Sequence, residues 1–155
     1  VYSEANNWSF TYLTTPIEKN TIYRATLVFN GTKEKLVGYI NNKNIGEKNN
    51  IGIMNKHPNH IAIGTMRDGS YFETGPDNST EKKYYFKGTI YEVRNWHERA
   101  LTEEEIINYK ANSLTGNETN LEALWLIDEN TNENLKDYTG NGHDGSIYGT
   151  ELILN

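Results

Sequence analysis

The residues best suited to chemistry lie in the segment 137–145, which reads DYTGNGHDG. Asp137, Asn141 and Asp144 carry carboxylate and amide oxygens, and Asp128 comes before them at the end of an expected strand. Ca²⁺ prefers such oxygen ligands and takes about six to eight of them in flexible geometry. The residue types therefore predict a structural calcium site formed by Asp128, Asp137, Asn141 and Asp144.

The same segment also fits a tight turn that binds no metal. Its glycines suit positive φ angles, and Asn and Asp side chains commonly hydrogen-bond to nearby main-chain groups. Turn chemistry and calcium binding ask for the same residue types here, so both interpretations stay open at this point.

A second candidate site is the polar segment 67–83, RDGSYFETGPDNSTEKK. Loops of this length in compact domains are often functional. Tyr71 and Phe72 offer aromatic rings that can stack on sugars, which also need polar groups in fixed directions. The hydroxyl-binding candidates are Arg67, Asp68, Asp77 and Asn78. The alternative is a solvated loop with both aromatic rings folded back on the core.

Enzymatic chemistry is disfavoured. Cysteine is absent, which excludes disulfides, thiol catalysis and thiolate metal sites. His57 and His60 are separated by Pro58 and lack the spacing of zinc ligands. The nearest carboxylate pair in one expected strand, Glu122 and Asp128, has only apolar residues between its members, unlike the paired acids of glycosidases. We therefore expect no catalytic residues.

The elements that position these residues centre on the segment 84–109. Its first half alternates aromatic and β-branched residues with others, which predicts a long strand over 84–93. Thr102 and Glu105 then fit a capping box, which predicts about two turns of helix. Further strands are expected at 8–13, 21–30, 36–40, 60–66, 121–127 and 146–154, with a hairpin turn at Asn30-Gly31.

Three motifs carry a family resemblance. The pattern F-x-G-x-I-x-E-V-R followed by W-x-x-R-A-L-T-x-E-E-I resembles the last strand and short helix of laminin-G-like, concanavalin A-like jelly-roll domains. The segment 115–149, with D-x-T-G-N-G-x-D-G, is similar to that family's closing segment, and the hairpin over 21–40 is similar to one of its hairpins. The resemblance implies an all-β, antiparallel jelly-roll β-sandwich with one short helix.

We expect residues 1–155 to form a single domain of this family. The resemblance, however, covers only the later part of the family's fold. One expected strand, 8–13, precedes the hairpin, whereas the family has several. The early strands lie on another chain, have been removed, or are lacking in a reduced variant. A sheet without its neighbours leaves open edges, so we expect a partner segment or a close dimer.

The composition and net charge of the chain limit the classes of molecule that it is expected to bind. At 155 residues the chain is one domain's worth of sequence, and its net charge of −6 makes nucleic acid a poor partner. No run of about 18 apolar residues predicts a membrane span. The chain begins at Val1 rather than Met, which leaves room for an export signal that was removed or never cloned. By resemblance we expect a secreted or cell-surface location.

The sequence thus predicts a non-catalytic recognition module that binds carbohydrate or a cell-surface glycan, or serves adhesion, within a larger protein. One alternative is a protein-interaction or structural module that completes a neighbouring domain. The other is a fragment of a glycoside hydrolase whose catalytic carboxylates lie elsewhere. Fold alone does not decide among them, because the architecture hosts all three.

Overall fold

The structure is a computed structural model that describes residues 13–52, 63–67, 83–111, 114–127 and 134–147. Within these ranges the regular elements are strands in small antiparallel sheets, apart from the one short helix α1 (Glu103–Ala111). No helix in them is long and apolar enough to cross a bilayer. The chain divides into two compact units, described in turn: Val1–His57 with Trp96–Leu114, and Pro58–Asn95 with Thr115–Asn155.

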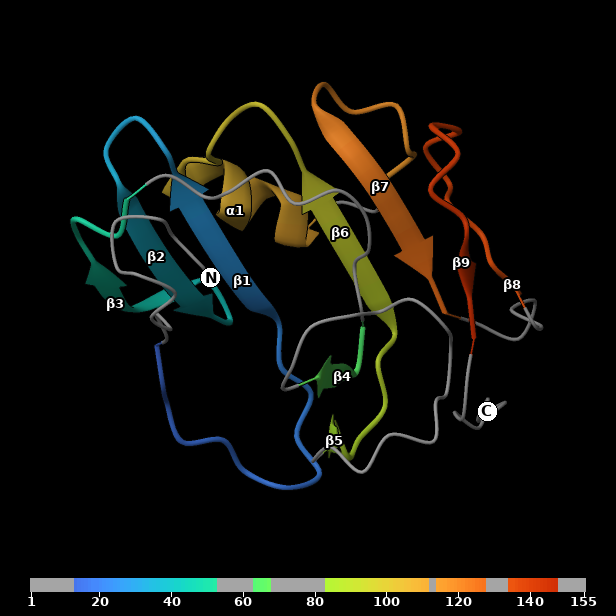
Figure 1. Ribbon diagram of the computed structural model, residues 1–155, viewed down its shortest axis with the longest axis horizontal. Coiled ribbons are helices and arrows are strands. Elements are labelled where there is room, and N and C mark those ends of the chain that lie inside the picture. The colour runs from blue at the N-terminus through green and yellow to red at the C-terminus, as the bar shows by residue number, and fades with distance from the viewer. Residues whose placement is uncertain (1–12, 53–62, 68–82, 112–113, 128–133, 148–155) are drawn as a thin grey trace. The chain divides into compact units, whose positions relative to one another are not determined.

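The first unit contains a three-stranded sheet in the order β1-β2-β3 (Figure 1). β1 (Ala25–Asn30) and β2 (Lys35–Ile40) form an antiparallel hairpin in which Ala25 lies opposite Ile40. β2 pairs in turn with β3 (Lys43–Lys48). The predicted hairpin over 21–40 is therefore confirmed, although its first strand begins at Ala25.

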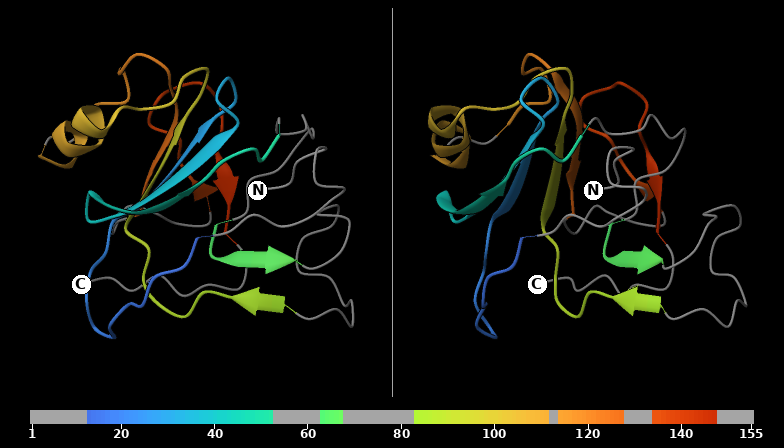
Figure 2. Two further views of the ribbon diagram at one scale, coloured as in Figure 1. Left: turned by 90° about the vertical axis from the view of Figure 1, so that its left-hand side faces the viewer. Right: turned by 60° about the vertical axis from the view of Figure 1, so that its left-hand side comes forward.

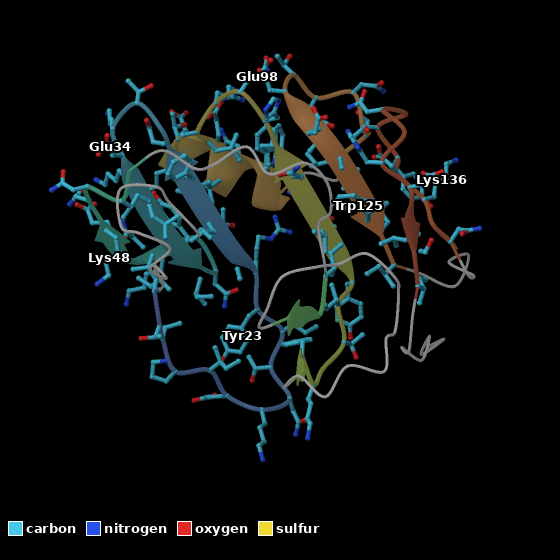
Figure 3. All side chains as sticks on the ribbon, viewed as in Figure 1. Tyr23, Glu34, Lys48, Glu98, Trp125 and Lys136 are labelled. Carbon is cyan, nitrogen blue, oxygen red and sulfur yellow. The ribbon has the colours of Figure 1, made fainter. Side chains whose placement is uncertain are left out.

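The β1–β2 turn differs from the expected Asn30-Gly31 turn with positive φ at both residues. The loop has four residues, 31–34, and its left-handed position is Glu34 with φ 47° (labelled in Figure 3). Asn30 closes the loop from one end, because its Oδ1 accepts a hydrogen bond from Lys33 N at 3.0 Å. In this longer loop the residue with positive φ is therefore Glu34, three residues after Gly31.

The strand β3 was not expected from the sequence. Asn41 and Asn42 have φ angles of 49° and 67°, so they complete a two-residue turn and the chain is free to pair again at Lys43. The segment KNIGEK has few residues that favour strands. Its strand geometry comes from main-chain pairing with β2 rather than from local preference.

The helix α1 begins as the capping box predicts. Thr102 N donates to Glu105 Oε2 at 2.8 Å, and Glu105 N donates back to Thr102 Oγ1 at 3.3 Å. Ile106 is buried, and the ring of Tyr109 stacks on Trp96 with the ring centroids 4.7 Å apart. The predicted helix start is therefore confirmed.

The second unit is built from pairs of short strands. β4 pairs with β5, β6 with β7, and β8 with β9. Figure 2 shows β4 and β5 as two short arrows pointing in opposite directions. The bounds of these strands are β4 (Thr65–Arg67), β5 (Lys83–Tyr85), β6 (Glu92–Trp96), β7 (Leu121–Leu126), β8 (Asn134–Leu135) and β9 (Gly145–Ser146).

The prediction of one continuous strand over 84–93 is wrong. β5 pairs with β4 in one sheet and β6 pairs with β7 in another, and the residues between β5 and β6 lie outside any strand. Phe86 N makes the last ladder-like contact, a 2.8 Å hydrogen bond to Gly64 O. The chain then bends at Gly88, which interrupts the alternating pattern.

The core of the second unit centres on β7, which confirms the predicted strand at 121–127. Leu121, Ala123 and Trp125 alternate along it and are buried, and Leu124 is buried as well. Trp125 (labelled in Figure 3) belongs to one core cluster with Ala123 and with Leu135 of β8. Partly buried side chains surround this cluster: Ile63, Val93, Ile127 and Ile147. The expected strand 8–13 lies outside the described residues apart from Leu13.

Candidate functional site

The candidate site is built around Asp137, which is only 3% exposed and is the one buried charged residue in the described part of the chain. It follows β8 and forms an antiparallel bridge with Trp125 of β7. The next residue, Tyr138, donates its main-chain N–H to Leu124 O at 2.8 Å. The turn that Asp137 begins is therefore joined directly to the central strand of this unit's core.

Both carboxylate oxygens of Asp137 accept hydrogen bonds. Oδ1 lies 3.1 Å from Leu124 N and 3.0 Å from Thr139 N, and Oδ2 lies 3.2 Å from His143 N. The Thr139 hydroxyl lies 2.8 Å from each oxygen. All these partners are N–H or O–H donors, so the negative charge is stabilised by groups of the turn and by one main-chain N–H of β7.

These contacts set the charge state of Asp137. Burial by itself would raise the pKa of this carboxyl, because it disfavours the charged form. The hydrogen bonds from Thr139, Leu124 and His143 outweigh burial, and the pKa of Asp137 lies below its ordinary value. The group is therefore ionised at neutral pH, as a structural anion at the centre of the turn.

Two other predicted calcium ligands stabilise the same turn. Asp144 Oδ1 accepts a hydrogen bond from Asp137 N at 2.7 Å. Asn141 donates its side-chain Nδ2 to Glu122 O at 3.0 Å and its main-chain N–H to the Thr139 hydroxyl at 3.2 Å. The structure therefore brings Asp137, Asn141 and Asp144 together, as predicted, but aims their polar atoms at the main chain and at one another.

The arrangement supports the turn interpretation over the calcium interpretation. Across the described ranges, no group of three or more His, Cys, Asp or Glu residues could hold a metal ion. A cation at Asp137 would have to displace N–H and O–H donors from both oxygens. Asp128, the fourth predicted ligand, lies outside the described residues. Calcium binding stays a prediction.

Trp125 holds the turn at His143 through a hydrogen bond from its indole ring. The sequence did not predict this role. The indole Nε1 donates to His143 O at 2.8 Å, while His143 Nε2 lies 2.7 Å from Glu122 Oε1. Trp125 itself is buried in the core. A buried indole N–H needs an acceptor, so the tryptophan alone indicated that some such partner exists.

A second turn supports the first. The Glu118 carboxylate accepts hydrogen bonds from Thr115 N at 2.8 Å and from Gly116 N at 3.0 Å. Burial opposes ionisation of Glu118, but these hydrogen bonds prevail and hold its pKa below the ordinary value. Gly116 has a φ of 93° and passes close to the main chain of Tyr138. The T-x-x-E spacing of Thr115 and Glu118 was the signal that could have revealed this turn.

Of the predicted recognition loop, the structure describes its first and last residues. Arg67 closes β4 opposite Lys83, and the other sugar-binding candidates lie outside the described residues. Those candidates are Asp68, Tyr71, Phe72, Asp77 and Asn78. Their proposed role stays a prediction.

Two exposed aromatic residues follow that loop, and the main chain of each makes a hydrogen bond to another segment. Phe86 is 55% exposed, and its N–H is bonded to Gly64 O. Tyr91 is 49% exposed, and its carbonyl accepts a hydrogen bond from Ile127 N at 2.9 Å. Sequence reasoning treated Phe86 as one face of a regular strand and did not single it out.

The ring of Phe86 lies against the main chain at Gly88. A Cβ atom added at Gly88 would be 2.8 Å from both Cε1 and Cζ of that ring. A side chain at position 88 would require the Phe86 ring to move. The ring thus lies against the main chain at Gly88, while more than half of the residue remains open to solvent.

Comparison with known proteins adds no further constraint. No protein-family model, curated protein or solved structure matches the chain significantly. The function must therefore be argued from the residues and contacts described above.

Proposed function

We propose that the chain is a non-catalytic carbohydrate-recognition module, with a jelly-roll β-sandwich fold, in a larger secreted or cell-surface protein. The observation that carries the proposal is the exposed Phe86 ring, which lies against the main chain at Gly88. The motif resemblance at 86–106 supports the fold. The exposed ring supports the choice of ligand.

Sugars suit this surface for a physical reason. A pyranose ring has a face of C–H groups that stacks on aromatic rings, and its hydroxyls then hydrogen-bond to polar groups at the edge. The main chain of Phe86 is held by Gly64, and its ring is packed on Gly88. A ring that rests against the main chain loses less conformational entropy on binding than a fully free ring, which leaves more of the contact energy as affinity.

The predicted loop and Phe86 belong to opposite ends of one ladder. The loop connects the pair Arg67–Lys83, whereas the hydrogen bond from Phe86 to Gly64 continues the other end. Three residues of strand separate these ends, or about 10 Å at ~3.3 Å per residue. We propose that a glycan oligomer contacts both, with Tyr71 and Phe72 at the loop end.

The first experiment is a glycan-array screen of this chain with calcium, repeated with EDTA. Carbohydrate hits support the module, and hits that survive EDTA show that recognition needs no calcium. A blank array from folded protein contradicts carbohydrate recognition. Hits that are lost in EDTA support the calcium prediction as well.

Variants of Phe86 then test the site on the strongest array glycan by calorimetric titration. Phe86→Ala and Phe86→Leu remove the flat ring and weaken binding about tenfold, or ~1.4 kcal/mol, whereas Phe86→Trp retains it. Ile107→Ala removes an exposed apolar side chain from α1 and serves as the matched control. Unchanged binding by Phe86→Ala with loss in Tyr71→Ala would move the site to the loop.

A second candidate, protein interaction, is favoured by a specific observation in the first unit. Ile22 is 77% exposed and Leu27, on the outer strand β1, is 59% exposed. Exposed aliphatic side chains on an outer strand are typical of surfaces that pair with another segment. Sedimentation of the chain tests this candidate: a dimer that Leu27→Lys dissociates supports it, and a monomer at all concentrations contradicts the predicted dimer.

A further inference from the structure

The described chain contains two Asn-Gly pairs, and the structure treats their amides differently. One is Asn30-Gly31 in the β1–β2 turn, and the other is Asn141-Gly142 in the Asp137 turn. In such pairs the main-chain nitrogen of glycine can attack the asparagine Cγ, because glycine has no Cβ to hinder the approach. The product is a cyclic succinimide, so each pair is a candidate site of spontaneous modification.

At Asn141 the amide is tied down. Its Nδ2, the leaving group, donates to Glu122 O at 3.0 Å and to Leu121 O at 3.4 Å. Its main-chain N–H is bonded to the Thr139 hydroxyl. Cyclisation would require the side chain to rotate away from β7, which breaks these contacts within the turn.

At Asn30 the hydrogen bond is made by the amide oxygen instead of the amide nitrogen. Its Oδ1 accepts a hydrogen bond from Lys33 N at 3.0 Å, and its Nδ2 has no hydrogen-bond partner in the described part of the chain. A donor on the amide oxygen draws electron density from Cγ and stabilises the negative oxygen that forms when a nucleophile adds. The leaving nitrogen faces no such restraint.

We propose that Asn30 is a site of spontaneous deamidation in the folded protein and that Asn141 is protected by the fold. The Gly31 nitrogen loses its proton and bonds to Asn30 Cγ, the Cγ–Nδ2 bond breaks, and ammonia leaves with that proton. Water then opens the succinimide to aspartate or isoaspartate. No oxidant, reductant or cofactor is consumed.

The modification would change the hairpin between β1 and β2. It adds one negative charge to a chain whose net charge is already −6, four residues from Glu34. Isoaspartate also lengthens the main chain by one carbon at the residue that pairs with Lys35. Of the two Asn-Gly pairs, the one in this turn would therefore be the first to deamidate.

The test uses the full chain, incubated at mildly alkaline pH both folded and in concentrated urea. Peptides spanning each Asn-Gly pair are followed by mass spectrometry and by enzymatic methylation of isoaspartate. In urea both sites react at similar rates, because both have glycine next. In the folded chain we expect Asn141 to slow many-fold and Asn30 to react several-fold faster than Asn141.

Equal protection of both sites by folding, or faster reaction at Asn141 in the folded chain, overturns the proposal. Gly31→Ala provides the matched control, since Gly31 has no positive φ and an added Cβ would approach the Phe29 ring no closer than 3.4 Å. This variant should lose the reaction at position 30 and keep the slow rate at Asn141. Undiminished reaction at position 30 also overturns the proposal, because the glycine nitrogen is the assigned nucleophile.

Discussion

A Cβ atom on Gly116 would lie 2.2 Å from the main-chain oxygen of Tyr138. The turn that begins at Thr115 and the turn that begins at Asp137 therefore meet main chain to main chain, with no side chain between them. Gly116 also has a φ of 93°, which side-chain-bearing residues rarely adopt. Two independent constraints thus require glycine at this position.

Gly116→Ala should lower the free energy of unfolding by about 3 kcal/mol, because it adds a main-chain clash to the cost of a positive φ. Gly140→Ala is the control, since Gly140 has a φ of 78° but open space around it. It should cost only about 1 kcal/mol. Urea unfolding measures both variants, and equal losses would mean that the close approach to Tyr138 carries no penalty.

Asp137→Asn should destabilise the protein by about 2–4 kcal/mol, because it removes a charge that accepts several hydrogen bonds and turns an amide NH₂ toward other donors. Asp144→Asn keeps an oxygen for Asp137 N and should cost under about 1 kcal/mol. Urea unfolding of the two variants at neutral pH provides the comparison. A small loss for Asp137→Asn would contradict its central role in the turn.

Stability should depend on pH through Asp137. Its pKa in the folded chain lies below the ordinary value of 3.8, so the unfolded chain takes up the proton first as pH falls. The stabilisation is complete well above pH 3.8 and is lost as pH falls through the lower, folded pKa. The stability difference between the unaltered chain and Asp137→Asn should be constant from neutral pH to about 5 and shrink below that. A difference that grows in acid would reverse the assigned sign.

Glu34→Gly should raise the free energy of unfolding by about 0.5 kcal/mol. Glu34 has a φ of 47°, and relief of its left-handed strain exceeds the extra backbone entropy of glycine. Lys33→Gly is the control, because Lys33 has no positive φ and glycine there brings only the entropic cost. Thermal unfolding of both variants should shift in opposite directions. A shift in the same direction would show that φ at position 34 is not limiting.

Gly88→Ala should weaken glycan binding about as much as Phe86→Ala while leaving the free energy of unfolding within about 1 kcal/mol. The new methyl would lie 2.8 Å from the Phe86 ring and push it from its resting position. Near-ultraviolet circular dichroism reports the ring displacement independently of binding. Retained binding with a displaced ring would separate Phe86 from the recognition site.

Elements whose sequences satisfy local rules were predicted correctly. The capping box placed the start of α1, because Thr102 and Glu105 satisfy the first-turn N–H groups without help from distant residues. The β1–β2 hairpin and β7 followed from alternating apolar residues. The grouping of Asp137, Asn141 and Asp144 also followed, since one short segment contains all three.

The remaining features depend on contacts between residues far apart in sequence. The strand β3 exists because β2 pairs with it, and the break at Phe86 arises where its main chain meets Gly64. The role of Asp137 was likewise undecidable locally, because its residue type suits either a cation or a turn. Leu124 N, from β7, joins Thr139 N and His143 N of the turn itself on that carboxylate.

The sequence by itself determined the β-rich class, the helix start and the turn-forming character of 137–145, because propensity, periodicity and capping act within a few residues. Only the tertiary structure decided that Asp137 is a buried anion satisfied by donors and that the Phe86 ring is exposed beside the main chain at Gly88. Burial and hydrogen-bond partnership are properties of neighbours brought together by folding, and the chemistry of a carboxylate or an aromatic ring depends on those neighbours.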